Sequence, residues 1–378
     1  MKLDPYLKLM AEKGGSDVFF TTGAPVSMNI EGVMHQVGKT ALEPGMVKEL
    51  AYSVMDDTQQ MGFEATMEMN LGMSLKNVGR FRINIYTQRG EVSMVIRYIK
   101  ADIPSIDDLN LPEKLKDLVM GRTGLVLVVG STGSGKSTSL AAMINHRSIT
   151  MPGHILTIED PIEYMFNHNK SIVGQREVGL DTLSYENALR EAMREAPDVI
   201  MIGEVRDRET MEAAIQYADT GHLCLSTLHS VNANQTLDRI ISFFPPDARN
   251  QILMDMSMNL SAIISQRLVE GKDGKRIAAI EILINSPYIS ELIRRGDFHE
   301  IKEIMEKGEA DGMQTFDQSL YRLYKADQID LEMALSYADS RSNLEWKINF
   351  GGSTDSLDHA RKDETLKFSA PDDLPDVK

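Results

Sequence analysis

The first hundred residues alternate between helical and strand-like spacing of their apolar side chains. Between Pro5 and Lys13 the apolar positions recur at helical spacing, and Gly14-Gly15 ends that segment. A second helical stretch is expected over 46–55. Shorter runs with strand character occupy residues 17–21, 26–30, 33–37, 67–73, 80–88 and 91–99. We therefore predict an α+β domain over residues 1–103.

The pattern changes beyond a charged linker at 104–120. Short, mostly apolar runs then alternate with helical segments, which is typical of parallel strands covered on both faces. The runs are Leu125–Val129, His154–Ile158, Val199–Ile202 and Leu223–Ser226, and the helices are Ser137–His146, Ser184–Glu195 and Arg208–Ala218. This alternation predicts a doubly wound α/β domain over 121–287. We expect a helical subdomain over 288–345 and a flexible tail over 346–378, which turns strongly polar at Gly351.

Composition and charge narrow the possible functions. Among 378 residues there are 40 Lys and Arg against 56 Asp and Glu, which gives a formal net charge of −16. Such a charge disfavours general binding to nucleic-acid phosphates or anionic lipid, because that binding relies on basic side chains. Cys224 is the single cysteine, so intramolecular disulfides and thiolate metal clusters are excluded. We expect it to be a core residue in a reducing cytoplasm.

The start of the chain and its apolar runs predict neither export nor a membrane span. The opening Met1-Lys2-Leu3-Asp4-Pro5 lacks the basic start and apolar stretch of a signal peptide. The most apolar short run, Leu125–Val129, is far below the about 20 residues that a spanning helix needs. We therefore expect a cytoplasmic protein that meets a membrane only through a partner.

A phosphate-binding motif follows the first of these apolar runs. Residues 130–137 match G-x-x-x-x-G-K-[ST] and lie between a predicted strand and a predicted helix. We expect Lys136 to bridge the β- and γ-phosphates of ATP and Ser137 to bind Mg²⁺. The alternative, a glycine-rich turn in a core, is disfavoured by the complete motif with both flanks. The predicted nucleotide-binding residues are Gly130, Ser131, Thr132, Gly133, Ser134, Gly135, Lys136, Ser137 and Thr138.

Carboxylates follow two of the other predicted strands. The apolar run at 199–202 leads to Gly203 and Glu204, and Glu204 is the candidate general base. Gly203 stands where such strands usually end in Asp, so the alternative is a carboxylate that caps the next helix. Glu159 and Glu163 follow the strand at 154–158, where they are candidates to position magnesium or water. An Asp-Pro turn with solvated charges is the alternative for that pair.

Histidines and arginines complete the candidate set. His222 and His229 bracket the apolar run at 223–226, and each is able to hydrogen-bond a γ-phosphate and report its presence to a neighbouring subunit. A structural histidine beside a strand is the alternative. Arg82 and Arg97 lie on strand-like segments of the first domain, and an ATPase completed at a subunit interface needs such cations. Spacing alone does not select them.

Together these motifs resemble the secretion ATPase superfamily and, within it, the type IV pilus retraction ATPases of twitching motility. The resemblance runs from about Leu3 to Ala338. Besides the motif at 130–137 it includes Gly15–Val18, Gly79–Asn84, Thr157–Tyr164, Gln175–Val178, Ala188–Arg194, Pro197–Asp207, and Thr220–His229.

The resemblance implies a hexameric ring of chains, each with an N-terminal PAS-like domain and a RecA-like P-loop ATPase domain that has a helical C-terminal part. By position, Glu204 is similar to the family's catalytic glutamate, and Glu159 and Glu163 to acids that lie near metal and water. His222 and His229 are similar to the family's paired histidines. Arg82 and Arg97 are similar to phosphate-facing arginines of the N-terminal domain.

Two departures favour an accessory retraction ATPase over the principal motor. First, the principal motor carries the motif Ala-Ile-Arg-Asn-Leu-Ile-Arg-Glu, and the corresponding residues 288–295 of this chain are Tyr-Ile-Ser-Glu-Leu-Ile-Arg-Arg. Second, this chain has an additional segment after about Asn343. The resemblance therefore implies work beside the principal retraction ATPase, on an inner-membrane platform protein at the pilus base. A single cysteine also argues against the assembly branch, which carries a tetracysteine zinc module.

Two other function classes stay open from the residues themselves. A nucleic-acid translocase with a RecA-like ring needs basic channel loops, which the charge of −16 does not favour. A non-motor adaptor would bind ATP to lock into the pilus machine without turnover. A small-molecule kinase has no use for the carboxylate and histidine motifs.

Overall fold

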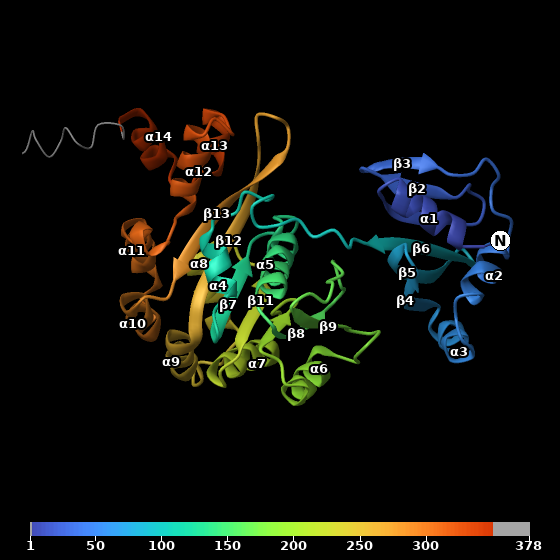
Figure 1. Ribbon diagram of the computed structural model, residues 1–378, viewed down its shortest axis with the longest axis horizontal. Coiled ribbons are helices and arrows are strands. Elements are labelled where there is room, and N and C mark those ends of the chain that lie inside the picture. Colours follow the sequence, from blue (N-terminus) through green and yellow to red (C-terminus); the bar gives the residue numbers. More distant parts are fainter. Residues whose placement is uncertain (1, 351–378) are drawn as a thin grey trace, which may run out of the picture.

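The computed structural model describes residues 2–350, and these form two bodies joined by one extended connection (Figure 1). The smaller body holds the N-terminal hundred residues. The larger body holds the phosphate-binding motif and the C-terminal helices. The flexible tail predicted beyond Gly351 lies outside the described residues.

The N-terminal body is a six-stranded antiparallel sheet with three helices, as the alternating pattern predicts. The strands run in the order β3-β2-β1-β6-β5-β4. Their buried side chains, among them Phe20, Met28 and Phe81, form one core with residues of α1 and α2. The elements are α1 (Asp4–Glu12), β1 (Gly15–Phe20), β2 (Ser27–Ile30), β3 (Val33–Gln36), α2 (Met46–Tyr52), α3 (Asp57–Thr66), β4 (Glu68–Leu75), β5 (Gly79–Gln88) and β6 (Glu91–Ile99).

Helix α3 was not predicted from the sequence. It contributes Phe63 as its one buried residue, so its apolar stripe is too weak to give a helical period. Its start is fixed locally, because the Asp56 side chain accepts from the Gln59 backbone N–H and the Gln59 side chain accepts from the Asp56 N–H. This reciprocal capping stabilises the first turn without burial.

The larger body is built on a seven-stranded sheet in the order β13-β12-β7-β11-β10-β8-β9. All neighbouring strands are parallel except β12 and β13, which form an antiparallel hairpin at one edge. The elements up to the hairpin are α4 (Lys114–Val119), β7 (Gly124–Val129), α5 (Lys136–Thr150), β8 (Gly153–Glu159), β9 (Ser171–Glu177), α6 (Tyr185–Ala192), η1 (Met193–Glu195), β10 (Val199–Ile202), α7 (Arg208–Asp219), β11 (Leu223–Leu228), α8 (Ala233–Ser242), α9 (Arg249–Asn259), β12 (Leu260–Glu270) and β13 (Arg276–Ile284).

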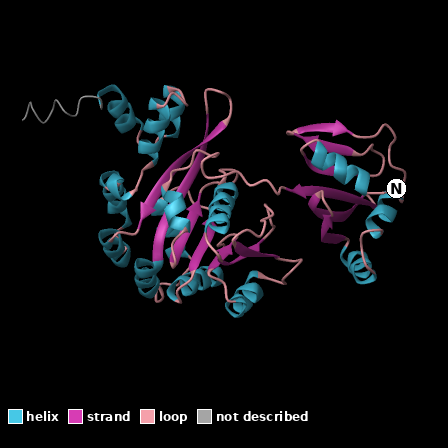
Figure 2. Cartoon of the chain, in the orientation of Figure 1, coloured by secondary structure: helices cyan, strands magenta, loops and turns pink. Residues whose placement is uncertain are grey.

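Helices cover both faces of this sheet, which confirms the predicted α/β fold (Figure 2). Along β7, Leu125, Leu127 and Val129 face a core shared with α6 to α11. Val126 and Val128 face the opposite core, shared with α4, α5 and the linker. Because both faces of the sheet are buried, the central strands have continuous apolar sequences.

Three strands of this sheet were missed. Strand β9 exposes Ile172 and has three half-buried positions from Gly174 to Arg176, so it lacks a continuous apolar run. Strands β12 and β13 bury the polar side chains Ser265, Gln266 and Glu281, which a hydrophobic pattern does not identify. These three polar side chains are hydrogen-bonded within the protein, and that pairing is what allows their burial.

The C-terminal residues form the predicted helical part. Its elements are α10 (Pro287–Arg295), η2 (Phe298–Glu300), α11 (Ile301–Lys307), η3 (Glu309–Asp311), α12 (Phe316–Lys325), α13 (Leu331–Tyr337) and α14 (Arg341–Phe350). Helix α14 extends past residue 345, where the sequence was expected to begin its tail, because Leu344 is buried against α12 and α13. No helix among residues 2–350 combines the length and the apolar character needed to cross a membrane.

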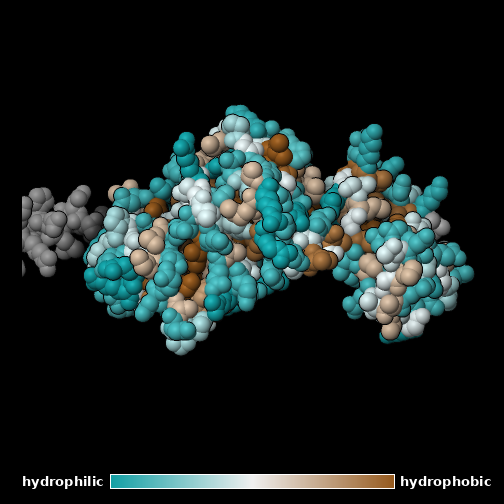
Figure 3. All heavy atoms as spheres, turned by 90° about the horizontal axis from the view of Figure 1, so that it is seen from below, coloured by the Kyte–Doolittle hydropathy of each residue, from teal (hydrophilic) through white to brown (hydrophobic). Residues whose placement is uncertain are grey.

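The two bodies meet over a narrow neck, and the face in view is mostly hydrophilic (Figure 3). At the neck the backbone N–H of Met165 donates to the carbonyl of Lys100 at 3.0 Å. An ion pair crosses nearby, since Arg82 Nε on β5 lies 3.8 Å from Glu177 Oε1 at the end of β9. The N-terminal body therefore touches the sheet at the carboxyl ends of its strands.

Candidate ATP-hydrolysis site

Parallel strands bring four separate sequence motifs to one edge of the larger sheet. Strands β7, β11, β10 and β8 are neighbours, and their carboxyl ends are followed by Gly130, His229, Gly203 and Asp160 respectively. Ligands of open α/β sheets bind at this edge. The arrangement explains why residues far apart in the sequence line one pocket.

The phosphate-binding loop connects β7 to the first turn of α5. Gly130, Gly133 and Gly135 have φ values of 156°, 77° and 90°, a region that side chains rarely adopt. A Cβ on Gly130 would also lie 2.4 Å from Ser134 Oγ and 2.5 Å from Gln266 O. The glycines therefore let the backbone turn tightly enough to aim its amides at a phosphate.

Lys136 is the first residue of α5, and its side chain ties the helix to the start of the loop. Its Nζ donates to the carbonyls of Gly130 and Ser131 at 2.9 Å each. The residue is 7% exposed, and this burial lowers the pKa of its ammonium, while the nearby Glu204 carboxylate opposes that shift. The Lys136 ammonium is thus held beside the loop, where it is able to contact phosphate oxygens.

Glu204 lies two residues after the end of β10 and has two charged or titratable partners. Its Oε1 is 3.1 Å from His229 Nε2, and its Oε2 accepts from Arg206 Nε at 2.7 Å. Arg206 also reaches Asp160 Oδ2 at 3.4 Å. These contacts orient the carboxylate toward the pocket that Lys136 and Ser137 also line.

Gly203, which stands in place of an aspartate, has a packing reason to be small. A Cβ there would meet Tyr185 Oη at 2.9 Å and the Cα of Glu159 at 3.2 Å. The carbonyl of Gly203 also accepts from Thr227 Oγ1 at 2.7 Å. Strands β8, β10 and β11 are therefore packed too tightly at this point for a longer side chain.

Glu159 ends β8 and is 6% exposed. Its Oε1 accepts from Thr157 Oγ1 at 2.7 Å and from Gln175 Nε2 at 3.2 Å. Burial raises the pKa of this carboxyl to about 7, although both hydrogen bonds act in the opposite direction. Near neutral pH the group is able to hold or release a proton.

These side chains line one pocket of about 340 Å³. It is bounded by the loop, by the ends of β8, β10 and β11, and by further residues that sequence reasoning did not assign to the site. Among the predicted residues the pocket contains Thr132, Gly133, Lys136, Ser137, Glu159, Glu163, Glu204 and His229. Among the unassigned residues are Tyr164, Tyr185 and Arg206, whose side chains are polar or charged. Arg206 lies inside a motif singled out above, and its position two residues after Glu204 was the available signal.

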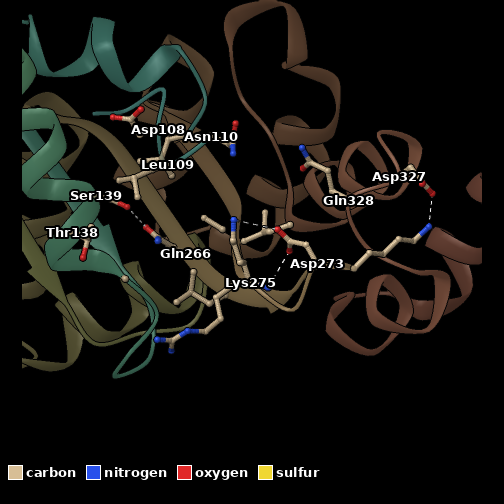
Figure 4. A pocket seen from close by; sticks show the side chains of 17 residues that line it. Asp108, Leu109, Asn110, Thr138, Ser139, Gln266, Asp273, Lys275, Asp327 and Gln328 are labelled. Atoms are coloured by element: carbon tan, nitrogen blue, oxygen red, sulfur yellow. Dashed lines mark hydrogen bonds and ion pairs between the residues drawn. The ribbon is translucent and has the colours of Figure 1, made fainter. Parts of the chain in front are cut away.

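The remaining loop residues face two other hollows. Gly135 and Thr138 line a cavity of about 620 Å³, bounded also by Asp108–Leu111 of the connection and by the β12–β13 hairpin (Figure 4). In it Ser139 Oγ donates to Gln266 Oε1 at 2.7 Å. Gly130, Ser131 and Ser134 line a third, open hollow beside Arg267 and Asp339. The 620 Å³ cavity lies next to the loop and is large enough for a nucleoside.

Comparison with known proteins adds the family. Residues 2–322 match the model described as type II/IV secretion system protein. The chain belongs to the type II/IV secretion system protein family. A Pseudomonas aeruginosa relative named type IV pilus ATPase PilU is 50% identical over 376 residues, which cover 99% of this chain and 98% of that protein.

Two further members of the family agree with that assignment. The type IV pilus retractation ATPase PilT of Pseudomonas aeruginosa is 38% identical over 91% of this chain and its own full length. A crystal structure of the pilus retraction motor PilT with bound ADP has a TM-score of 0.84, at 42% identity over 91% of this chain and 99% of that one. Within the family this chain is therefore an ATPase of the PilU type.

Three predicted site residues of this family member lie away from the pocket. His222 directly precedes β11, at the amino ends of the parallel strands and therefore opposite the carboxyl ends that form the pocket. There its Nδ1 is 3.1 Å from Thr220 Oγ1. Arg97 pairs with Asp17 within the N-terminal body, at 2.7 Å. Arg82 faces Glu177, as described above. A single chain therefore does not bring these three to the γ-phosphate side of the loop.

Proposed function

We propose that this ATPase works as a motor of type IV pilus retraction, accessory to a principal retraction ATPase. The observation that carries the proposal is the Glu204–His229 pair, which faces Lys136 and Ser137 across one pocket. Identity of 50% to a protein named type IV pilus ATPase PilU supports the same branch. The altered segment at Tyr288–Arg295, on helix α10, supports the accessory role.

The proposed nucleotide is ATP, with its phosphates on residues 130–138 and its nucleoside in the cavity beside Asp108–Leu111. Oxygen donors suited to Mg²⁺ are present, namely the Ser137 hydroxyl and the carboxylates of Glu159 and Glu163. When bound, magnesium supplies charge neutralisation at the phosphates. The proposed domain limits are 1–103 for a PAS-like domain, 104–120 for the linker, 121–287 for a RecA-like domain and 288–350 for the helical part, which includes α14.

In the proposed reaction Glu204 takes the proton of the attacking water. Its carboxylate is held from both sides, by His229 at Oε1 and by Arg206 at Oε2. A fixed base costs little reorganisation in the transition state. His229 touches Glu204 and lines the same pocket, so it is suited to respond to the γ-phosphate. Lys136 supplies positive charge to the phosphates as charge develops on them.

We propose that the chain assembles as a homo-hexamer. Arg82, Arg97 and His222 lie outside the pocket of their own chain, so we expect a neighbouring subunit or a movement of the N-terminal body to complete the site. The ring would act through an inner-membrane platform protein at the pilus base, in the cytoplasm and peripheral to the inner membrane. We propose no role for nucleic acid, in keeping with the net charge of −16.

Two measurements test this proposal. In the purified full chain with magnesium, Glu204→Gln should abolish ATP turnover while leaving ATP binding intact, and parental turnover would contradict the assignment of the base. Normal binding without turnover in the parental chain would instead support the adaptor. In cells, retraction events should fall when this protein is deleted and should require the principal motor; unchanged retraction without that motor would exclude the accessory role.

A further inference from the structure

The buried Glu281 lies outside the pocket and contacts α8 and β12, two elements that adjoin those that build it. Glu281 is on β13 and is 3% exposed. Its Oε1 accepts from the backbone N–H of Ala233 at 2.8 Å and from Ser265 Oγ at 2.9 Å. Two donors from different elements thus converge on one carboxylate oxygen.

The first donor anchors the segment that carries His229. Strand β11 ends at Leu228, and residues 229–232 lead directly into α8, whose first residue is Ala233. Asn232 caps this helix, since its side chain accepts from the Gln235 N–H at 2.9 Å. The bond from Ala233 to Glu281 ties the end of this short segment to the sheet. Its other end continues the buried strand β11.

The second donor connects Glu281 to the root of the phosphate-binding loop. Ser265 is on β12 and pairs in register with Val129, the last residue of β7 before Gly130. The next residue, Gln266, accepts from Ser139 of α5, and its carbonyl lies against Gly130. Glu281 therefore joins the strand beside the loop to the helix behind His229.

The setting of Glu281 makes this contact costly to lose. Burial raises the pKa of the Glu281 carboxyl; Asp339, after α13, raises it further, and Arg267 of β12 lowers it. Lys302 of α11 lines the same small cavity of about 280 Å³. Asp339 itself pairs with Arg267 and Lys302, at 2.7 and 3.1 Å. Removal of the Glu281 acceptor leaves the buried Ala233 N–H without its partner.

We propose that Glu281 is a positioning residue for ATP hydrolysis, which holds the His229 segment and the phosphate-binding loop in register through its bonds to Ala233 and Ser265. Glu281 does not line the 340 Å³ pocket, and it acts on the reaction through the placement of His229. The inference rests on the proposed role of His229 in the reaction. It predicts an effect on turnover that is larger than any effect on nucleotide binding.

Substitutions at Glu281 test the proposal in the full chain with magnesium. Glu281→Met keeps the length of the side chain and removes the acceptor, whereas Glu281→Gln keeps an acceptor oxygen for both donors. We expect kcat to fall about tenfold in the Met variant, since a small displacement of a positioned group costs up to about 100-fold. KM and ADP affinity should stay within about twofold, and the Gln variant within about threefold of parental kcat.

A double-mutant cycle with His229→Ala tests the route of the effect. If Glu281 acts through His229, Glu281→Met should change kcat less than about twofold once His229 is already removed. Gln314→Ala is the matched control, because Gln314 is buried against the same strand, where its side chain donates to the carbonyl of Ile280 at 2.6 Å. It should lower thermal stability without the loss of turnover.

The contrary outcomes are distinct. Parental kcat in folded Glu281→Met, an equal loss in Gln314→Ala, or a full tenfold effect in the His229→Ala background would each overturn the positioning role. If His229→Ala alone keeps parental kcat, the proposed role of His229 fails together with this inference. If Glu281→Met does not fold, Ser265→Ala takes its place, with an expected loss of two- to threefold in kcat that disappears without His229.

Discussion

Burial of Glu159 should make the protein less stable as the pH rises toward neutrality. The carboxyl has an ordinary pKa of 4.5, and burial raises this pKa to about 7 in the folded chain. Between these two pH values the folded chain therefore keeps a proton that the unfolded chain releases. Stability is therefore lost as the pH rises from about 4.5 to about 7, and the cost is complete above that range. At about 1.4 kcal/mol per pH unit, the cost is about 3 kcal/mol.

Glu159→Gln removes this titration while its side-chain oxygen still accepts from Thr157 and Gln175. We expect the variant to match the parent near pH 4.5 and to exceed it by about 3 kcal/mol at pH 8. Urea unfolding of both proteins across that range measures the difference. Glu303→Gln is the control, because Lys307 lowers the pKa of the exposed Glu303 and the effect has the opposite sign. A difference that does not change with pH would refute the reasoning.

Four further substitutions or reactions have defined outcomes. Arg206→Ala should lower kcat on the order of tenfold with little change in KM, since the 2.7 Å bond that orients Glu204 is lost. Gly203→Ala should destabilise the chain by about 1–3 kcal/mol in urea unfolding, because its Cβ would meet Tyr185 at 2.9 Å. Arg147→Met should cost about 3 kcal/mol by the same measurement, because the carbonyls of Val119 and Gly121 lose their buried donor. Cys224 is fully buried and its thiol pKa is raised by burial, so a thiol reagent should label it only after unfolding, as mass spectrometry would detect.

The fold could be predicted where a single face or both faces of an element are apolar. Strands such as Leu125–Val129 are buried on both sides, so their runs are continuous and their assignment was confirmed. Helix α3 and strands β9, β12 and β13 carry polar or alternating residues whose burial depends on tertiary partners. Ser265 and Glu281 show the reason, because the hydrogen bond between them satisfies buried polar groups that the sequence pattern does not pair.

The pocket could be predicted because its residues follow the ends of parallel strands. Residues at those positions share one edge, so Lys136, Glu159, Glu204 and His229 were brought together. Arg206 and Tyr185 enter the pocket through contacts that spacing does not encode. The register of β5 and β6 sets Arg82 beside Arg97, and each meets a different carboxylate, an arrangement that the sequence pattern does not indicate.

The connection between the two bodies also forms a wall of the cavity beside α5. Asp108–Leu111 line it together with Thr138 and the hairpin (Figure 4). Any orientation of the N-terminal body that moves these residues alters the affinity of the cavity for its occupant. By thermodynamic reciprocity, the occupant must bias that orientation by the same factor. If the nucleoside occupies this cavity as proposed, its binding and the orientation of the N-terminal body are thermodynamically coupled.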